Sequence, residues 1–551
     1  MREFRWAVAV LTLTATAWLA VPDTSAAADG KPRWVLHVER FSGGISNGVR
    51  FSLDPVVAAA RGKYKVQAAP SSQAADNVPL PSGAAGNVQM NDDSNPPVPQ
   101  NEESVAYRTD IPMIAVAAAN DYVSGGVVVM RTKDGGRNWK STRVVPQFAP
   151  TRDFCTGGDP AVAYSSRDRA FYLAQLCFFR AADPSEIHVF KSLDNGATWT
   201  PGRFAAVAAT NFDPETGEVD PAFFNDKELI AIDNNPTSSW YGRLYVAYTR
   251  FHVLPDGSSD SCPIQLAYTD NVPSFNPSLT VWQHTSVVPD SFGDDGVGPS
   301  ANQFAVPVVE KSGALDIAFV LEECNTSLDH GLRFQKSTDG GATFLNKPVK
   351  VNKPGQWKDN PDLADLIPNT AFRAPNTVSL AYSPKTGTLV YAYTNYKLGR
   401  GNGNIDVSLS HDGGLTWSDS QTISLAGSEP ARNNQFFPWV AATPNGKFEA
   451  VWLDRRQDPD NHDIGTFGAR SNDDGVTWKN RKIGTATWDP DLGFFTSGAF
   501  IGDYSGLAAH DRVVYPVWTD GRNNSIGETG IGETDVFTDV EIRDAGAALT
   551  D

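Results

Sequence analysis

The stretch Thr132-Lys133-Asp134-Gly135-Gly136-Arg137-Asn138-Trp139 decides the fold, because the chain repeats its pattern five times. The other copies lie at 192–199, 337–344, 410–417 and 471–478. Each copy has a hydroxyl residue, Asp two residues later, Gly four later and Trp or Phe seven later. Such a phrase predicts a β-hairpin turn, in which Gly takes a positive φ and Asp accepts hydrogen bonds from nearby amides. Five copies indicate a repeat architecture.

The spacing of the copies indicates one further unit that lacks the phrase. The Asp residues at 134, 194, 339, 412 and 473 are 60, 145, 73 and 61 residues apart. The long gap is close to two ordinary ones, so we expect a unit with a degenerate turn at about 266–282. Seven polar clusters also run into apolar strands, at 101–106, 158–163, 225–231, 302–306, 375–378, 434–440 and 502–508.

These units predict an all-β protein, a β-propeller of four-stranded antiparallel blades. Seven blades are favoured, and six are possible if one start is an insertion. The last unit has only three strands before the end, so we expect residues 34–39 to add the fourth and close the ring. Residues 101–551 then form the propeller, and 29–100 form the closing strand followed by an Ala/Pro/Ser-rich linker.

Residues 1–28 have the pattern of a signal peptide: Arg2 and Arg5, an apolar stretch over 6–20 and Ala at 26–28. We therefore expect a secreted protein, cleaved near residue 28, with no membrane anchor. The net charge of −18 disfavours nucleic acid as a partner, and we expect a monomer. Export makes Cys155, Cys177, Cys262 and Cys324 candidates for disulfides.

The repeated phrase resembles the Asp box, or bacterial neuraminidase repeat, and residues 101–542 resemble the sialidase-like β-propeller superfamily. The resemblance implies the propeller fold. It leaves the activity open, because such propellers include glycosidases, polysaccharide lyases, sorting receptors and non-catalytic modules.

The direction of the strands predicts where a site would lie. The repeated turn joins the third strand to the fourth, so it lies on the same face as the turn between the first and second strands. The opposite face, here called the top, receives the starts of first strands, the ends of second strands and the longer loops. All four cysteines map to this face, which predicts the pairs Cys155–Cys177 and Cys262–Cys324.

The polar starts of the first strands should enter the central axis from the top. The carboxyl candidates for catalysis are Asp159, Asp226 and Glu228, and strand alternation predicts that Lys227 points away from the latter two. Paired carboxyls suit glycoside hydrolysis, and Tyr504 could act as the base of a lyase. The candidates for substrate binding here are Glu102, Arg373, Asn434, Gln435 and Asp503.

Two other interpretations of these starts stay open. The polar groups could cap the inner strands in a glycan- or protein-binding propeller without catalysis. Alternatively, Asp159, Asp226 and Glu228 could hold a structural Ca²⁺ ion, and we expect no other cofactor.

Arginines at the ends of second strands form a second candidate set. Arg455, Arg456 and Arg522 follow a Trp-x-Asp motif in the last two blades. They could pair with the Asp of their own motif, or bind the carboxylate of an acidic sugar. Sialidases place their first arginine in a Tyr/Phe-Arg-Ile-Pro phrase, whereas residues 107–112 read Tyr-Arg-Thr-Asp-Ile-Pro. This departure argues against sialic acid, and we expect an extracellular glycan or polysaccharide as the partner.

Overall fold

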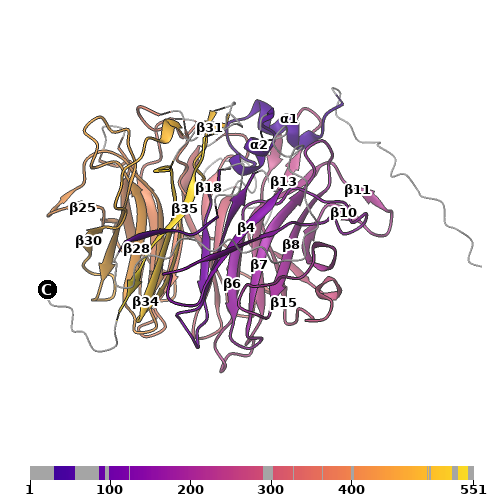
Figure 1. Ribbon diagram of the computed structural model, residues 1–551, viewed down its shortest axis with the longest axis horizontal. Helices are drawn as coiled ribbons and strands as arrows, with labels where there is room; N and C mark the ends of the chain where they lie inside the picture. Colours follow the sequence, from indigo (N-terminus) through magenta and orange to yellow (C-terminus); the bar gives the residue numbers. More distant parts are fainter. Residues whose placement is uncertain are drawn as a thin grey trace, which may run out of the picture.

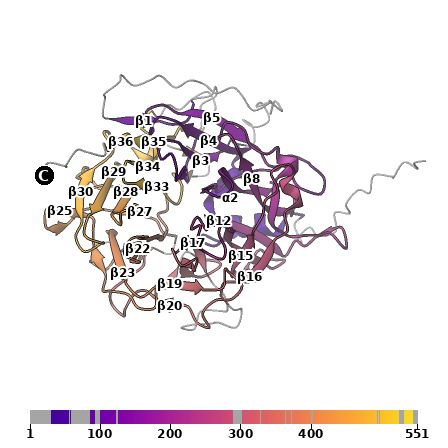
Figure 2. The ribbon, with the colours of Figure 1, turned by 90° about the horizontal axis from the view of Figure 1, so that it is seen from below.

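Seven four-stranded antiparallel sheets surround a central axis, which confirms the predicted propeller (Figure 2). The computed structural model describes residues 30–55, 57, 86–92, 99–122, 125–288, 302–326, 328–362, 364–370, 372–398, 402–492, 494–495, 498–523 and 532–543. The predicted signal peptide lies outside these residues. First strands of neighbouring blades contact one another around the axis, so their starts are the positions from which side chains can meet.

The blades follow the chain in order. Blade 1 consists of β2 (Ser104–Tyr107), β3 (Ala115–Asp121), β4 (Gly126–Thr132) and β5 (Lys140–Val144). Blade 2 consists of β6 (Ala161–Ser165), β7 (Ala170–Phe178), β8 (Ser185–Ser192) and β9 (Ala206–Thr210). Blade 3 consists of β12 (Phe223–Ile232), β13 (Leu244–Val253), β15 (Ile264–Thr269) and β16 (Gln283–Ser286), with β14 (Ser259–Ser261) beside β13. Its last two strands are the predicted unit without the phrase.

The remaining blades have the same order of strands. Blade 4 consists of β17 (Gln303–Val309), β18 (Leu315–Glu322), β19 (Asp329–Ser337) and β20 (Val349–Lys350). Blade 5 consists of β21 (Ser379–Tyr382), β22 (Leu389–Asn395), β23 (Asn404–Ser410) and β24 (Gln421–Thr422). Blade 6 consists of β27 (Gln435–Ala442), β28 (Phe448–Asp454), β29 (Gly465–Ser471) and β30 (Lys479–Lys482). Blade 7 consists of β33 (Gly506–His510), β34 (Val513–Asp520), β35 (Asp535–Asp539) and β1 (Asn87–Gln89), with β36 (Glu541–Ile542) beside β34.

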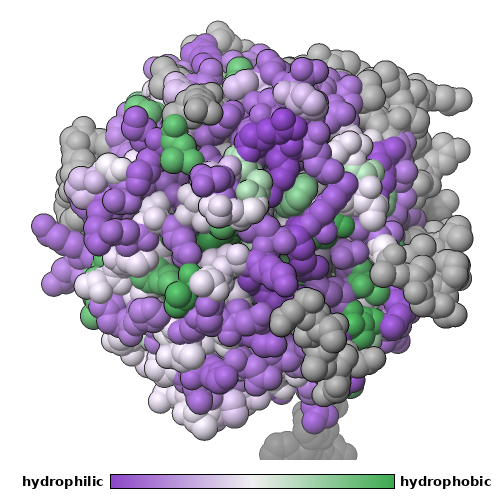
Figure 3. Space-filling view, turned by 90° about the vertical axis from the view of Figure 1, so that its left-hand side faces the viewer, coloured by the Kyte–Doolittle hydropathy of each residue, from purple (hydrophilic) through white to green (hydrophobic). Residues whose placement is uncertain are grey.

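Short elements lie in the loops between the strands of the blades. They are the hairpins β10 (Phe212–Asp213) with β11 (Glu218–Val219), β25 (Leu425–Ala426) with β26 (Glu429–Pro430) and β31 (Phe494–Phe495) with β32 (Gly498–Ala499), and the 3₁₀ turns η1 (Gly202–Phe204), η2 (Pro277–Leu279) and η3 (Pro490–Leu492). On the face where β25 and β30 lie, hydrophilic residues dominate and apolar ones occur in small separate groups (Figure 3).

The repeated phrase makes the same turn in all five blades that carry it. In blade 6, Ser471 donates its hydroxyl to Asp473 at 2.8 Å, and the Gly475 amide donates to Ser471 at 2.9 Å. Asp473 also accepts from the Thr477 amide at 2.9 Å. Corresponding bonds recur in the other four copies. The phrase therefore fixes a turn by satisfying its backbone donors locally.

The aromatic residue that ends the phrase joins neighbouring blades. The Trp417 ring of blade 5 lies 5.4 Å from Phe334 of blade 4 and 5.7 Å from Tyr391, measured between ring centroids. Trp139 of blade 1 similarly meets Tyr515 of blade 7 at 6.2 Å. Edge-on aromatic contacts of this kind add to the stabilisation from buried area, so Trp139 and Trp417 each help to hold two blades together.

The prediction for the closing strand is right in kind and wrong in position. Residues 34–39, predicted to be that strand, belong to helix α1 (Arg33–Arg40). The fourth strand of blade 7 is β1, which pairs antiparallel with β35 and lies in the segment predicted to be a linker. The sequence Trp-Val-Leu-His-Val at 34–38 is buried throughout. A run of five buried residues has no clear period, so helix and strand could not be told apart.

Two short N-terminal helices lie on the top face, α1 and α2 (Asn47–Ser52) (Figure 1). Trp34 of α1 packs between Phe178 of blade 2 and Phe224 of blade 3. Both predicted disulfides are confirmed, Cys155–Cys177 and Cys262–Cys324. Among the described residues, no helix has the length and apolar character needed to cross a membrane.

Candidate functional site

Backbone strain at the strand starts turns charged side chains into the axis. Glu102 and Asp159 precede the first strands of blades 1 and 2, and Lys227 lies within β12 of blade 3; their φ angles are 62°, 51° and 55°. A left-handed φ is costly for such residues and clusters at functional sites. All three side chains are buried.

The Lys227 side chain contacts carboxyls that come from the starts of three other blades. The pairing of β12 with β13 shifts register between Asp226 and Leu229. This bulge holds Lys227 at a positive φ and breaks the alternation on which the prediction depended. The Lys227 Nζ lies 2.9 Å from Asp503, 3.3 Å from Glu102 and 3.6 Å from Asp159.

A second cation, Arg373, binds the same Asp503 carboxylate. Its Nη2 lies 2.9 Å from Oδ2 of Asp503, and its Nε lies 3.3 Å from Oδ1. Burial opposes ionisation of Asp503, but Arg373 and Lys227 outweigh it and lower its pKa to about 2. Asp503 is therefore ionised at neutral pH.

The buried groups at the axis, here called the central cluster, are Glu102, Asp159, Asp226, Lys227, Glu228, Arg373 and Asp503. The pKa values of its other carboxyls are raised, whereas that of Asp503 is lowered. Burial, reinforced by the charge of Asp159, raises the pKa of Glu102 and of Glu228 well above the usual range. Burial also raises the pKa of Asp159 and of Asp226 to about 6, with Lys227 partly offsetting it. The central cluster thus holds protonated and ionised carboxyls side by side, as acid–base chemistry requires.

Tyr504 lies beside the cluster with a protonated phenol. Burial, together with the charges of Glu102 and Asp159, raises the pKa of Tyr504 well above its usual value. Lys227 lies over the Tyr504 ring, with Nζ 5.3 Å from its centroid. The position of Tyr504 fits stacking of its ring better than abstraction of a proton by its phenol.

The floor of the cluster is apolar. A small cavity next to Lys227, Glu228 and Tyr504 is also lined by the following residues of blades 3 to 6: Leu229, Phe304, Val306, Thr377, Val378 and Trp439. Neither carboxyl oxygen of Glu228 has a hydrogen-bond partner among the described residues. An acid in an apolar pocket stays protonated, which is the state a proton donor needs.

The arginines of the two Trp-x-Asp motifs pair with their own motif. Arg456 binds Asp454 at 2.6 Å, and Trp452 also donates to that carboxylate, at 2.8 Å. Arg522 binds Asp520 at 2.6 Å, and Trp518 donates to the same group at 2.9 Å. The motif is a local structural unit, which favours the first of the two interpretations given for it.

Three other predicted binding residues contact neighbouring loops. Arg455 donates to the carbonyl of Pro368 at 2.8 Å. Asn434 accepts from the Gly403 amide at 2.8 Å, and Gln435 donates to the carbonyl of Arg432 at 2.9 Å. The structure thus gathers Glu102, Asp159, Asp226, Glu228, Arg373, Asp503 and Tyr504, while the substrate-binding role of Arg455, Asn434 and Gln435 stays a prediction.

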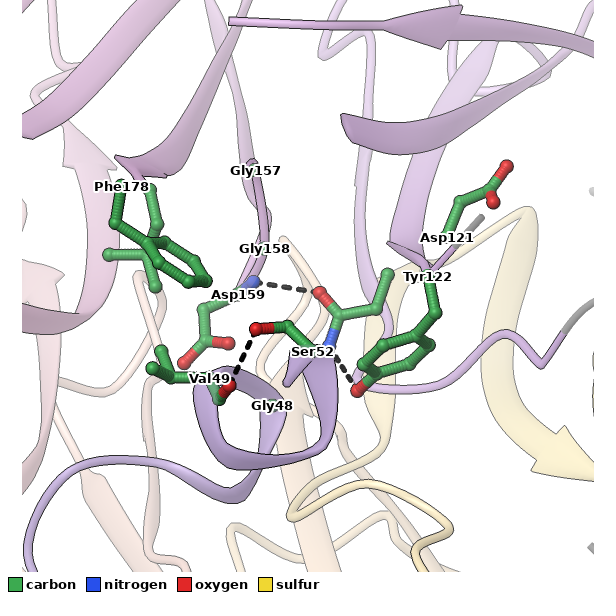
Figure 4. Close-up of a pocket in the computed structure, with 11 residues that line it drawn as sticks. Gly48, Val49, Ser52, Asp121, Tyr122, Gly157, Gly158, Asp159 and Phe178 are labelled. Carbon is green, nitrogen blue, oxygen red and sulfur yellow. Dashed lines mark hydrogen bonds between the residues drawn. The ribbon is translucent and has the colours of Figure 1, made fainter. Parts of the chain in front are cut away.

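Sequence reasoning missed the segment that lies on the cluster. Residues 41–52 link α1 to the end of α2, and Ser46 donates its amide to Asp226 at 2.6 Å. Figure 4 shows Gly48 and Ser52 facing Asp159 and Tyr122 across a small pocket. The glycines at 43, 44 and 48 were the available signal, because small residues permit close backbone approach.

The predicted Ca²⁺ site fits the residues poorly. A calcium ion needs six to eight oxygens around it. Here the ammonium of Lys227 already lies 3.6 Å from Asp159, and Asp226 accepts from the Ser46 amide. A calcium ion would have to displace both partners, so no step is assigned to one.

No family model matches the chain, and no curated protein matches its sequence. Among solved structures, a protein of unknown function from Dyadobacter fermentans matches with 14% identity and a TM-score of 0.43, over 73% of this chain and 97% of that one. The Hadza microbial sialidase Hz136 matches with 14% identity and a TM-score of 0.41, over 84% and 96%. The α-L-arabinanase of Penicillium chrysogenum matches with 13% identity and a TM-score of 0.41, over 70% and 94%.

A sialidase, an arabinanase and an arabinofuranosidase are thus among the similar structures. At such identities and TM-scores these likenesses carry no argument about activity. The seven-bladed architecture rests on the sheets of this chain.

Proposed function

We propose that this protein is a glycoside hydrolase that acts on an extracellular glycan in the central cluster. One observation carries the proposal: buried carboxyls with opposite protonation lie around one point of the axis. Hydrolysis of a glycosidic bond needs a carboxylic acid to protonate the leaving oxygen and a carboxylate as base or nucleophile.

Glu228 and Asp159 suit these two roles. Glu228 is protonated, because it is buried and because Asp159 is charged. Asp159, with a pKa of about 6, is largely ionised at pH 7. The charge of Asp159 thus helps to keep the proton on Glu228, so the two groups support each other's state. In this scheme Asp503 fixes Lys227 and Arg373, and Asp226 binds a sugar hydroxyl.

The charges favour a neutral sugar or an amino sugar as the substrate. Five carboxyls lie in the cluster, and its two cations, Lys227 and Arg373, both bind Asp503. An acidic sugar would need a guanidinium or ammonium group for its own carboxylate. It would therefore have to displace Asp503.

A second candidate is a propeller that binds glycan or protein without catalysis. The burial of the whole cluster, with no exposed carboxyl, favours it. A lyase with Tyr504 as base fits less well, because the raised pKa keeps its proton at neutral pH.

Export, a monomeric state and the lack of a membrane anchor are part of the proposal. Two disulfides suit an oxidising compartment, and residues 1–28 would direct the chain there. Mass spectrometry of the protein in culture medium tests this point. A secreted protein that still contained residue 2 would contradict cleavage near residue 28.

The test of hydrolysis is a panel of aryl glycosides and polysaccharides, assayed with the wild-type chain and with G48E, a variant that should expose the central cluster. D159N and E228Q should each lower kcat/KM about 10²-fold or more. D419N is the control, since Asp419 is exposed and pairs with the exposed Lys353. If G48E turns over no substrate, or if D159N and E228Q both keep full activity, the proposal of hydrolysis at this site is wrong.

A further inference from the structure

Residues 41–52, here called the plug segment, bind the central cluster through backbone groups. The Ser46 amide donates to Asp226 at 2.6 Å. Gln303 donates to the Gly44 carbonyl at 2.7 Å, and Arg373 reaches the Ser42 carbonyl at 3.5 Å. The plug segment thus contacts blades 3, 4 and the loop before blade 5 from above the axis.

The plug segment also lies directly on the two acids of blades 1 and 2. A Cβ atom added to Gly48 would come within 2.8 Å of a carboxyl oxygen of Asp159 and 3.1 Å of one of Glu102. Figure 4 shows Gly48 of α2 next to Asp159. No residue with a side chain fits there without movement, so the backbone fills the place above these acids.

Helix α1 and the plug segment share one apolar cluster, and the plug segment also makes polar contacts at the axis. Trp34 and Val38 of α1 are buried in an apolar cluster with blades 2 and 3. The plug segment adds Ile45 and Val49 to that cluster and stacks Phe51 on Phe500 at 5.0 Å. Its remaining contacts with the axis are the polar ones above. Those can be exchanged for water or for a ligand, whereas the apolar contacts of α1 cannot.

The ring does not need the plug segment for closure. Blade 7 is completed by β1, which follows the plug segment in the chain. The contacts with the acids therefore need another explanation than closing the propeller.

We propose that the plug segment is an intramolecular inhibitor, which occupies the ligand position of the central cluster and must leave before a glycan can enter. Its amide and carbonyl groups supply to Asp226, Gln303 and Arg373 the donors and acceptors that sugar hydroxyls would supply. Inhibition rests on the proposed hydrolase function, whereas the sealing of the cluster is independent of it.

The first test uses G48E, which places a carboxylate against Asp159 and Glu102 and should expel the plug segment. G86E is the matched control, because a Cβ atom at Gly86 has nothing within 4 Å. Carbodiimide labelling, read by peptide mass, reports access to Asp159 and Glu228 relative to exposed Asp419. We expect labelling of both acids to rise at least 10-fold in G48E only, and glycoside turnover to rise with it.

A second pair of variants separates opening from misfolding. S46P removes the amide that binds Asp226, at a φ of −55° that proline can adopt. S46A keeps this amide and removes only the hydroxyl that accepts from Val49. S46P should increase labelling and turnover, while S46A should leave both near wild type with a small loss of melting temperature.

The outcomes are distinct. Rapid labelling of Asp159 in the wild type would overturn the sealing. Increased labelling without increased turnover, in a protein whose wild type already hydrolyses the same substrate, would overturn the inhibition. Increased labelling with no turnover in any variant would support the sealing and refute the hydrolase function.

Discussion

The ammonium of Lys227 in blade 3 lies 2.9 Å from the carboxylate of Asp503, which precedes blade 7 and is 276 residues away in the chain. Both groups are buried, and Asp503 also binds Arg373 before blade 5. Three blades thus meet through one buried carboxylate at the axis.

Replacing Lys227 with Met should destabilise the protein by about 3–5 kcal/mol, because Asp503, Glu102 and Asp159 then lose a buried cation. Urea unfolding measures the change. K353M is the control, since Lys353 and Asp419 form an exposed pair, for which we expect less than about 1 kcal/mol. Equal losses in the two variants would contradict the central role of the Lys227 pairs.

Much of the architecture could be predicted from the sequence, because it depends on local patterns that repeat. The Asp and Gly of each turn phrase satisfy their own turn, so five copies indicated the blades and their direction. That direction also brought Cys262 and Cys324 together. Strand alternation is interrupted at Lys227 by a bulge, which depends on the partner strand as well as on the residue itself.

Contacts across the axis could not be predicted. Asp503 was expected near the site, but its pairing with Lys227 and Arg373 depends on how seven blades close. The plug segment was missed because residues 34–39 were assigned to the closing strand. With that assignment, the glycines at 43, 44 and 48 did not by themselves indicate that residues 41–52 lie over Asp159.

The stability of the protein should fall on acidification partly because of His37. Burial, opposed by hydrogen bonds to backbone groups at Gly257 and Gly43, lowers the pKa of His37 to about 4. Between pH 6.5 and 4 the unfolded state therefore binds more protons than the folded state. The contribution of His37 is full above pH 6.5 and is lost as pH falls toward 4, at about 1.4 kcal/mol per pH unit.

Asp159 and Asp226 act in the opposite sense over part of this range. Their raised pKa values, about 6, mean that the folded state keeps their protons as pH rises from 4 to 6, so stability falls with rising pH. The contribution of His37 is therefore measured as the difference between wild type and H37Q in unfolding titrations. A difference that does not change between pH 7 and pH 5 would contradict the prediction.

Introducing a charge on the closing strand should open blade 7. Val88 of β1 is buried against blade 7, so V88D should lower stability by about 2–4 kcal/mol. V476D is the matched control at an exposed valine in the turn of blade 6. Hydrogen exchange should increase in β35 of the first variant, and protection of β35 equal to wild type would contradict closure by β1.

Both disulfides should contribute to stability, the longer loop more. The C155S/C177S double variant opens a 22-residue separation, and C262S/C324S opens one of 62. Loop-closure entropy gives losses of about 3 and about 4 kcal/mol respectively. Melting curves of the two variants, with the reduced wild type for comparison, check the order. A reversed order would show that native contacts, and not loop length, control the effect.

The pairing of β1 with β35 also sets the order of events during protein synthesis. The ribosome releases β1 before all other strands of the propeller, and its partner β35 emerges only after blades 1 to 6. For nearly the whole of translation β1 therefore has no strand to pair with, while blades 1 to 6 can form in turn. A chain that stops short of residue 535 would leave both β1 and the edge of β34 unpaired, which exposes two strands to aggregation. Termination before residue 535 should thus be as damaging as loss of a whole blade.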